Sequence, residues 1–227
     1  MRIIAFDLDE TLGEFIYLSQ LWNYISNENY NVNQNHFNYL CSLFPEFFRP
    51  YIFEILHYLI KHKRFDDKIV IYTNNSGEKS WTMYIKNYIE FKIGQKIFDN
   101  VVCAYKVNGR VIEPKRTSHE KIYSDLIRCV GASYGTSVCF VDDRVHEQMR
   151  HPRVDYIHVK PYHTKFNKIG AVNRLYYSNF HFSNINHLAM NLSTEYNKSR
   201  NDEDIDKNVT QQMYLHLTKY ILRNDSL

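Results

Sequence analysis

Short apolar segments constrain this chain more than any other feature. Each has four or five residues, and they occupy positions 2–6, 69–72, 101–104, 138–141 and 156–159. A strand that is apolar on both faces is typical of a sheet covered by helices on both sides. Polar residues directly follow the first, second and fourth segments. The pattern therefore predicts a buried parallel sheet with strands that end in polar side chains.

Amphipathic helices are expected between these strands. Apolar residues recur at helical spacing over 52–60, 81–89 and 122–130, which puts one apolar stripe on each helix. Thr117 followed by Glu120 fits a capping box that opens the third helix. Strand–helix alternation implies parallel strands joined by right-handed crossovers. We therefore expect an α/β, doubly wound, Rossmann-like domain over residues 1–165.

Two segments stand outside this alternation. Residues 13–48 carry apolar positions at helical spacing and predict a small helical insertion after the first strand, beside the ligand crevice. Residues 166–227 are expected to form a C-terminal helical extension. Within it, the polar stretch 194–208 predicts a linker, and the apolar spacing from Val209 to Ile221 predicts a last helix. We expect this helix to pack on its own domain.

Composition and cysteine spacing narrow the class of protein. A hydrophobic content of 44% and an aromatic content of 15% exclude a wholly disordered chain. A net charge of +3 is too small to indicate a nucleic-acid or membrane partner by itself. The four cysteines form no CxxC pair, so no zinc site is indicated. A chain of this size and apolar content does not indicate a disulfide framework either. With no long apolar run and no signal-like start, we expect a soluble intracellular protein, in cytoplasm or nucleus, without membrane contact.

Polar residues after three strands are the candidate site. They are Asp7, Asp9 and Thr11 after the first, Thr73 and Asn74 after the second, and Asp142 and Asp143 after the fourth. In an open parallel sheet, ligands bind beyond the carboxyl ends of the strands. We therefore expect these three groups to converge on one edge of the sheet.

Four acids at one edge need a counter-charge. Crowded carboxylates repel one another, and a hard divalent ion with oxygen ligands removes that repulsion. Mg²⁺ is the usual ion beside a phosphate, to which the Thr73 hydroxyl and the Asn74 amide can donate. A lysine is also expected, and Lys115 stands between the third strand and the next helix. Lys106 is left open as its alternative.

These residues resemble a known family. The segment Asp7-Leu8-Asp9-Glu10-Thr11-Leu12 resembles the first motif of the haloacid dehalogenase (HAD) superfamily. Thr73, Lys115 and the pair Asp142-Asp143 are similar to its second, third and fourth motifs, in the right order. The first motif and Arg49-Pro50 are also similar to the NLI-interacting-factor branch, the protein phosphatases that act on the C-terminal domain of RNA polymerase II.

The resemblance implies a Mg²⁺-dependent phosphatase with an aspartyl-phosphate intermediate. Asp7 would be the nucleophile, and Asp9 would be the general acid and base. Thr73, Asn74 and Lys115 would bind the phosphate. Asp7, Asp142, Asp143 and the backbone carbonyl of Asp9 would hold the metal, and which member of the acidic pair touches it directly stays open.

Three alternatives concern the substrate and the activity. A small insertion favours an open site and a phosphoprotein substrate. A nucleotide, a sugar phosphate or a polynucleotide 3′ end is the second candidate, and a HAD-fold binding protein without turnover is the third. The basic stretch 160–168 leaves a nucleic-acid contact weakly supported. The sequence does not indicate an oligomeric state.

Overall fold

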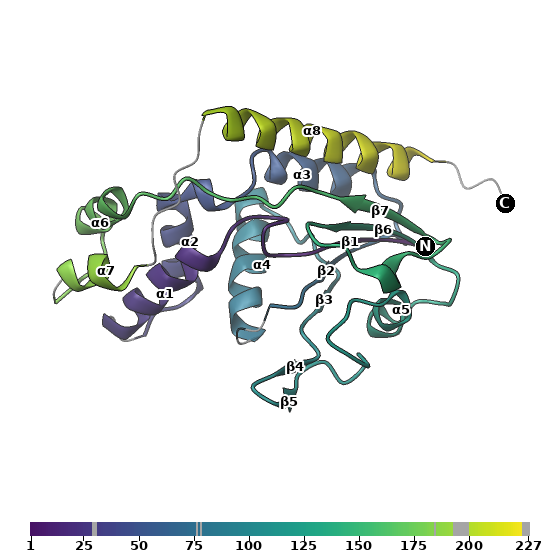
Figure 1. Ribbon diagram of the computed structural model, residues 1–227, viewed down its shortest axis with the longest axis horizontal. Coiled ribbons are helices and arrows are strands. Elements are labelled where there is room, and N and C mark those ends of the chain that lie inside the picture. Colours follow the sequence, from purple (N-terminus) through teal and green to yellow (C-terminus); the bar gives the residue numbers. More distant parts are fainter. Residues whose placement is uncertain (29–30, 76, 78, 184, 193–199, 224–227) are drawn as a thin grey trace.

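The computed structural model describes residues 1–28, 31–75, 77, 79–183, 185–192 and 200–223. Its main sheet has five parallel strands in the order β3-β2-β1-β6-β7 (Figure 1). The strands are β1 (Arg2–Phe6), β2 (Lys68–Tyr72), β3 (Asn100–Val102), β6 (Ser137–Asp142) and β7 (Val154–His158). Counted along the chain, this is the order 3-2-1-4-5 of a Rossmann-like sheet. The expected doubly wound α/β fold is confirmed.

Strand register brings the ends of β1, β2 and β6 level with one another. Phe6 pairs with Ile71 on one side and with Val141 on the other. All five residues of β1 are buried, as its continuous apolar sequence predicts for a central strand. Residues that follow these three strands therefore begin at the same edge of the sheet.

Helices cover both faces of the sheet. Ile4 and Phe6 point into a cluster that includes side chains from α3 (Ile52–His62), α4 (Lys79–Ile93) and α8 (Arg200–Leu222). Ile3 and Ala5, which alternate with them, belong to a second cluster with α5 (Tyr123–Val130). The result is a three-layer arrangement with β1 in the middle (Figure 1).

The insertion after β1 is helical, as expected. It contains α1 (Ile16–Glu28), α2 (Gln34–Leu43) and the short 3₁₀ helix η1 (Pro45–Phe47). Asn33 caps α2 by accepting hydrogen bonds from two backbone amides, which gives the asparagine-rich stretch a local role. Buried aromatic rings then join the insertion to the main body, including the pair Phe48–Tyr88, in which Tyr88 belongs to α4.

The segment between β3 and α5 departs from the expectation. It forms a small antiparallel hairpin of β4 (Lys106–Val107) and β5 (Arg110–Val111). The expected helix does form, but it begins at Tyr123, so Thr117 and Glu120 are no capping box. The buried carboxylate of Asp125 accepts hydrogen bonds from the Thr117 amide and hydroxyl instead.

The C-terminal part adds α6 (Lys168–Tyr176), α7 (Asn186–Asn191) and α8, while a 3₁₀ turn η2 (Glu147–Met149) precedes β7. Helix α8 begins at Arg200, so residues 200–208 are helical rather than linker, and 194–199 lie outside the described residues. Buried Met213, Leu217 and Tyr220 join the core beside α3, so this helix packs on its own domain as expected. The division at residue 165 stays a prediction.

No helix in the described ranges is long and apolar enough to cross a membrane.

Candidate active site at the carboxyl edge of the sheet

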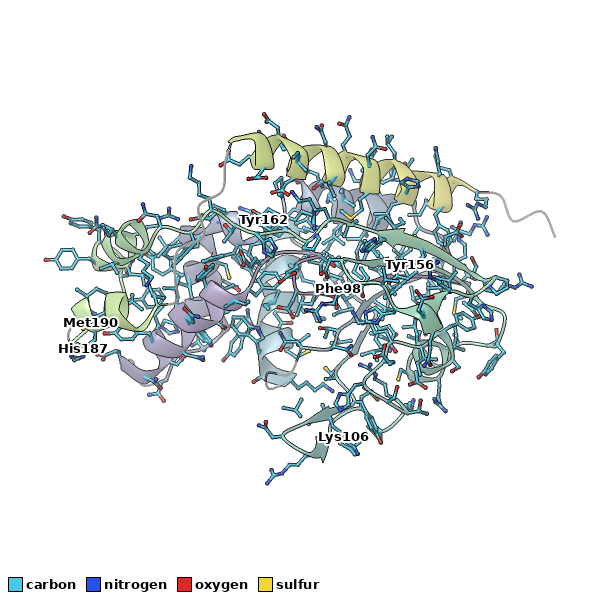
Figure 2. The ribbon with its side chains drawn as sticks, in the orientation of Figure 1. Phe98, Lys106, Tyr156, Tyr162, His187 and Met190 are labelled. Carbon is cyan, nitrogen blue, oxygen red and sulfur yellow. The ribbon has the colours of Figure 1, made fainter. Side chains whose placement is uncertain are left out.

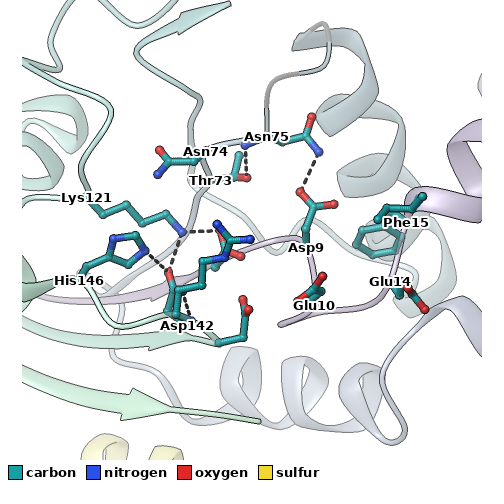
Figure 3. A pocket seen from close by; sticks show the side chains of 14 residues that line it. Asp9, Glu10, Glu14, Phe15, Thr73, Asn74, Asn75, Lys121, Asp142 and His146 are labelled. Atoms are coloured by element: carbon teal, nitrogen blue, oxygen red, sulfur yellow. Dashed lines mark hydrogen bonds and ion pairs between the residues drawn. The ribbon is translucent and has the colours of Figure 1, made fainter. Parts of the chain in front are cut away.

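Polar residues begin where β1, β2 and β6 end. Backbone hydrogen bonds carry the strand ladders one step further, from the Asp7 amide to the Val141 carbonyl (2.9 Å) and from the Thr73 amide to the Val102 carbonyl (3.0 Å). These residues line a pocket of about 380 Å³ (Figure 3). Its lining is Asp7, Asp9, Glu10, Glu14, Phe15, Ile16, Thr73, Asn74, Asn75, Lys121, Asp142, Asp143, Arg144 and His146.

The pocket lies where the strand order reverses. The chain runs outward from β1 to β2 and β3, and then returns to place β6 on the other side of β1. Asp7 follows β1 and Asp142 ends β6, so the two acids flank this switch point. In open α/β sheets the switch point is where ligands bind.

Three buried acids form a candidate metal centre. Asp7, Asp142 and Asp143 each offer a carboxylate oxygen, and these oxygens lie within 4.8 Å of one another. Hard oxygen donors at this spacing fit Mg²⁺, which prefers carboxylates and keeps some of its water. The Asp9 carboxylate is not part of this cluster. Its Oδ2 accepts a hydrogen bond from Asn75 Nδ2 (2.7 Å).

The lysine at this site is Lys121. Its Nζ contacts Asp7 Oδ1 directly and donates to Asp142 Oδ2 at 2.6 Å. Figure 3 shows it reaching between the acids from the segment before α5. The structure does not bring the expected Lys115 into this pocket: its side chain is exposed, and its carbonyl accepts a hydrogen bond from Arg128. Lys106 lies on the hairpin (Figure 2), with its ammonium over the Tyr105 ring.

Burial and charge act on the acids in opposite directions. Burial raises the pKa of Asp7 to about 7; the Lys121 ammonium opposes the rise, and the Asp142 carboxylate adds to it. Burial also acts upward on Asp142, but hydrogen bonds from His146 and Lys121 outweigh it and hold its pKa below the usual value. Asp142 Oδ1 also accepts a hydrogen bond from the Arg144 amide (2.8 Å), which lowers its pKa further. Burial raises the pKa of Asp9 as well.

The turn after β1 is held by two residues. The Thr11 hydroxyl donates to Asp143 Oδ1 (3.1 Å) and accepts from the Asp143 amide (3.1 Å), so it ties the first turn to the acidic pair. Arg49 is buried and donates to the carbonyls of Thr11 (2.6 Å) and Glu10 (2.7 Å). Glu10 has a positive φ of 59°, a strained conformation for a residue with a side chain. Together these contacts fix the direction in which Asp9 leaves the strand.

Sequence reasoning missed Asn75 and the role of Arg116. Besides binding Asp9, Asn75 donates its backbone amide to the Thr73 hydroxyl (2.9 Å), so one residue touches two candidate site residues. Arg116 lies behind the Thr73–Asn74 turn and donates to both residues. Neither belongs to a recognisable motif, and only the three-dimensional contacts identify them. His146 also lines the pocket, with Nε2 3.5 Å from Asp142 Oδ2.

The fold and the pocket define an open α/β protein with an acidic binding site at its topological switch point. No protein-family model matches the chain, and no curated protein matches it at a significant level. Two solved structures are similar to it over 97% of its length at 16% sequence identity. One is described as Fcp1, an essential RNA polymerase II CTD phosphatase (TM-score 0.43); the other is a variant of the fission yeast RNA polymerase II CTD phosphatase Fcp1 bound to beryllium fluoride (TM-score 0.42).

The chain spans 63% of the length of each of these two structures. Because the sequence identity is 16% and both TM-scores are below 0.5, the functional argument rests on the residues of the pocket.

Proposed function

We propose that this chain is a HAD-type, Mg²⁺-dependent phosphomonoesterase. The observation that carries the proposal is one buried cluster at the switch point, in which Lys121 bonds both Asp7 and Asp142, and Asp143 completes a triad within 4.8 Å. Three acids with one lysine have a surplus of negative charge. A buried site relieves such a surplus by taking up a proton, as the raised pKa of Asp7 indicates, or by binding a cation.

Asp7 would be the nucleophile. It would attack the phosphorus in line with the leaving oxygen and form an aspartyl-phosphate. A carboxylate is a weak nucleophile, so correct positioning and charge neutralisation must supply most of the rate. Bound Mg²⁺, held by Asp7, Asp142, Asp143 and the Asp9 carbonyl, would neutralise the carboxylates and polarise the phosphate oxygens.

Asp9 would be the general acid and base. Its raised pKa favours the protonated form, which would donate its proton to the leaving oxygen; the resulting carboxylate would then take a proton from the water that hydrolyses the acyl-phosphate. The hydrogen bond from Asn75 holds the Asp9 side chain at the pocket wall, beside the Thr73 turn.

Thr73, Asn74 and Lys121 would bind the phosphate. Thr73 offers a hydroxyl and Asn74 a backbone amide, and both residues line the pocket. Lys121 would take the role that the resemblance gave to Lys115, because it already bridges the nucleophile and Asp142. Its charge would offset the negative charge of both the nucleophile and the substrate.

We propose a phosphoprotein as the substrate, inside the cell. The insertion contributes only Glu14, Phe15 and Ile16 to the pocket lining, which supports a site that a large substrate can approach. Nucleotides, sugar phosphates and 3′-phosphorylated oligonucleotides are the comparison arm of a substrate screen. Faster turnover of any of these than of phosphopeptides would replace the phosphoprotein assignment.

Asp7→Asn should abolish release of phosphate from p-nitrophenyl phosphate while the circular dichroism spectrum stays that of the parent. The amide keeps the size of the side chain but cannot form the phosphoenzyme. Adding EDTA to the parent should stop turnover, and Mg²⁺ should restore it. Turnover by the variant near the parent rate would remove Asp7 from its role, and a parent without metal-dependent activity on any monoester would indicate the binding protein without turnover.

A further inference from the structure

Arg116 is a buried cation with an unusual set of partners. Its side chain lies behind the pocket, and the residue is only 2% exposed. Five oxygens accept hydrogen bonds from its two terminal nitrogens: Thr73 O (3.1 Å), Cys103 O (2.8 Å), Asn74 Oδ1 (2.7 Å), His119 O (3.0 Å) and Glu120 O (3.1 Å). These partners come from the end of β2, the end of β3 and the segment before α5. One guanidinium therefore joins three parts of the chain that meet at the site.

The contact with Thr73 determines where the next amide points. Thr73 O and the Asn74 N–H belong to the same peptide unit, which is planar and trans, so they face opposite directions. Arg116 binds the carbonyl from behind, and the Asn74 N–H is thereby directed to the other side, where Thr73 and Asn74 line the pocket. A second contact, to Asn74 Oδ1, fixes the side chain of the same residue.

The contacts with His119 and Glu120 act on the lysine. These two carbonyls come immediately before Lys121, and Arg116 Nη2 donates to both. Lys121 is itself buried, with its Nζ bonded to Asp7 and Asp142. The backbone that carries the ammonium is thus attached to the same guanidinium that orients the Asn74 amide.

The charge of Arg116 is not neutralised by an acid. All five of its hydrogen-bond acceptors are uncharged oxygens, no ion pair joins it to a carboxylate in the described part of the chain, and its guanidinium carbon lies over the Tyr72 ring at 4.9 Å. A buried cation without a counter-ion is costly, so an anion bound nearby would stabilise it. A lysine could not replace it, because a single ammonium lacks the fork that reaches all three segments.

From this geometry we infer that Arg116 is a positioning residue that couples the two phosphate-binding groups of the site, the Asn74 amide and the Lys121 ammonium. The inference rests on the proposed function, since it assigns the pocket to a phosphate. It adds a specific claim: phosphate affinity depends on a side chain that touches neither the phosphate nor the metal.

The test measures binding of inorganic phosphate by calorimetry in the presence of Mg²⁺, and KM and kcat with p-nitrophenyl phosphate. Arg116→Gln should weaken phosphate binding at least tenfold and raise KM by a similar factor. Arg116→Lys keeps the charge and should recover only part of the affinity. Phosphate binding by both variants as tight as by the parent would overturn the inference.

Matched variants separate this role from loss of structure. Arg128→Gln is the control, because Arg128 donates to the Lys115 carbonyl and pairs with Asp125 but lines no part of the pocket; its phosphate affinity should equal that of the parent. If Arg116→Gln does not fold, Asn74→Ala tests the same coupling at an exposed residue. It should weaken phosphate binding two- to fivefold, and an unchanged affinity would overturn the inference.

Failure of the proposed function gives a different result. If the parent binds phosphate in an Arg116-dependent way but hydrolyses no monoester, the proposed phosphatase activity is refuted and the positioning role of Arg116 is supported. A parent that hydrolyses monoesters with no dependence on Arg116 would refute the coupling alone.

Discussion

Buried ions lie at both ends of the central sheet, and the two clusters are built differently. At the amino end, Arg2 Nη2 bonds Asp67 Oδ2 at 2.6 Å, with side chains 3% and 1% exposed. Arg2 Nη1 also donates to the Tyr220 (2.9 Å) and Ile221 (3.0 Å) carbonyls at the end of α8. At the carboxyl edge, one lysine pairs with two members of a cluster of three acids.

The contrast separates a structural ion pair from a functional cluster. Arg2 and Asp67 neutralise each other, and the remaining donors of Arg2 find backbone carbonyls, so this cluster needs no further partner. In the pocket, burial and the neighbouring carboxylate raise the pKa of Asp7, even though Lys121 lies in contact with it. Both clusters are buried and contain ion pairs, but they differ in charge balance. We expect a ligand at the carboxyl edge, where the charges do not balance.

The largest effect is expected on stability, at the amino end of the sheet, where Arg2 and Asp67 neutralise each other. Arg2→Met leaves Asp67 buried without its counter-charge, which should cost about 3–5 kcal/mol of unfolding free energy. Phosphatase activity per folded molecule should stay at the parent level, because the variant lies at the far end of the strand. Urea unfolding and p-nitrophenyl phosphate turnover measure the two quantities. A loss below about 1 kcal/mol would mean that this pair contributes no more than an exposed surface pair.

The next effect concerns the lysine of the pocket. Lys121→Met should lower kcat/KM by about 10²–10³-fold, the loss typical when one preorganised donor is removed. The carboxylates it leaves uncompensated should make the variant gain more thermal stability from Mg²⁺ than the parent does. Lys115→Met is the matched control, and its kinetics should equal those of the parent. A greater loss with Lys115→Met than with Lys121→Met would restore the original motif assignment.

The smallest effect is expected from pH in the metal-free protein. Folding raises the pKa of Asp7 from 3.8 to about 7, so its contribution to stability is present at low pH and is lost as pH rises between these values. Asp142, with its pKa lowered, contributes in the opposite direction but at lower pH, because its stability is present above 3.8 and is lost as pH falls below that value. Unfolding midpoints should decline from pH 4 to 7, and Asp7→Asn or Mg²⁺ should flatten the decline. A midpoint that rises over this range would contradict the assignment.

Strand ends could be predicted because two independent signals coincide at them. A continuous apolar segment specifies a strand buried on both faces, and the topology of parallel sheets then brings the residues after such strands to one edge. Asp7, Thr73 and Asp142 follow from this reasoning without any side-chain geometry. The pairing of β1 with β6 then brings carboxylate oxygens of Asp7, Asp142 and Asp143 within 4.8 Å of one another.

Residues between the strands could not be placed in the same way. The segment after β5 has no periodicity, so sequence position favoured Lys115, while the buried Arg116 and Lys121 turn inward. The predicted capping box at Thr117 does not form. The Thr117 amide donates instead to the carboxylate of Asp125, which is fully buried and requires hydrogen-bond donors. Residues 200–208 are polar and predict a linker, yet they are helical because Asp206 is buried and the following turns pack on the core, and such packing outweighs low helix propensity.

The central position of β1 has a consequence for biosynthesis. This strand precedes both of its neighbours in the sequence: Ile3 pairs with Lys68, and Phe6 pairs with Val141. Arg2 is also bonded to carbonyls of residues 220 and 221, at the other end of the described chain. Contacts so distant in sequence slow folding, because long loops must close first. A nascent chain therefore leaves this fully buried strand unpaired on one side until residues 137–142 have emerged, and exposed apolar strands of this kind are prone to aggregate.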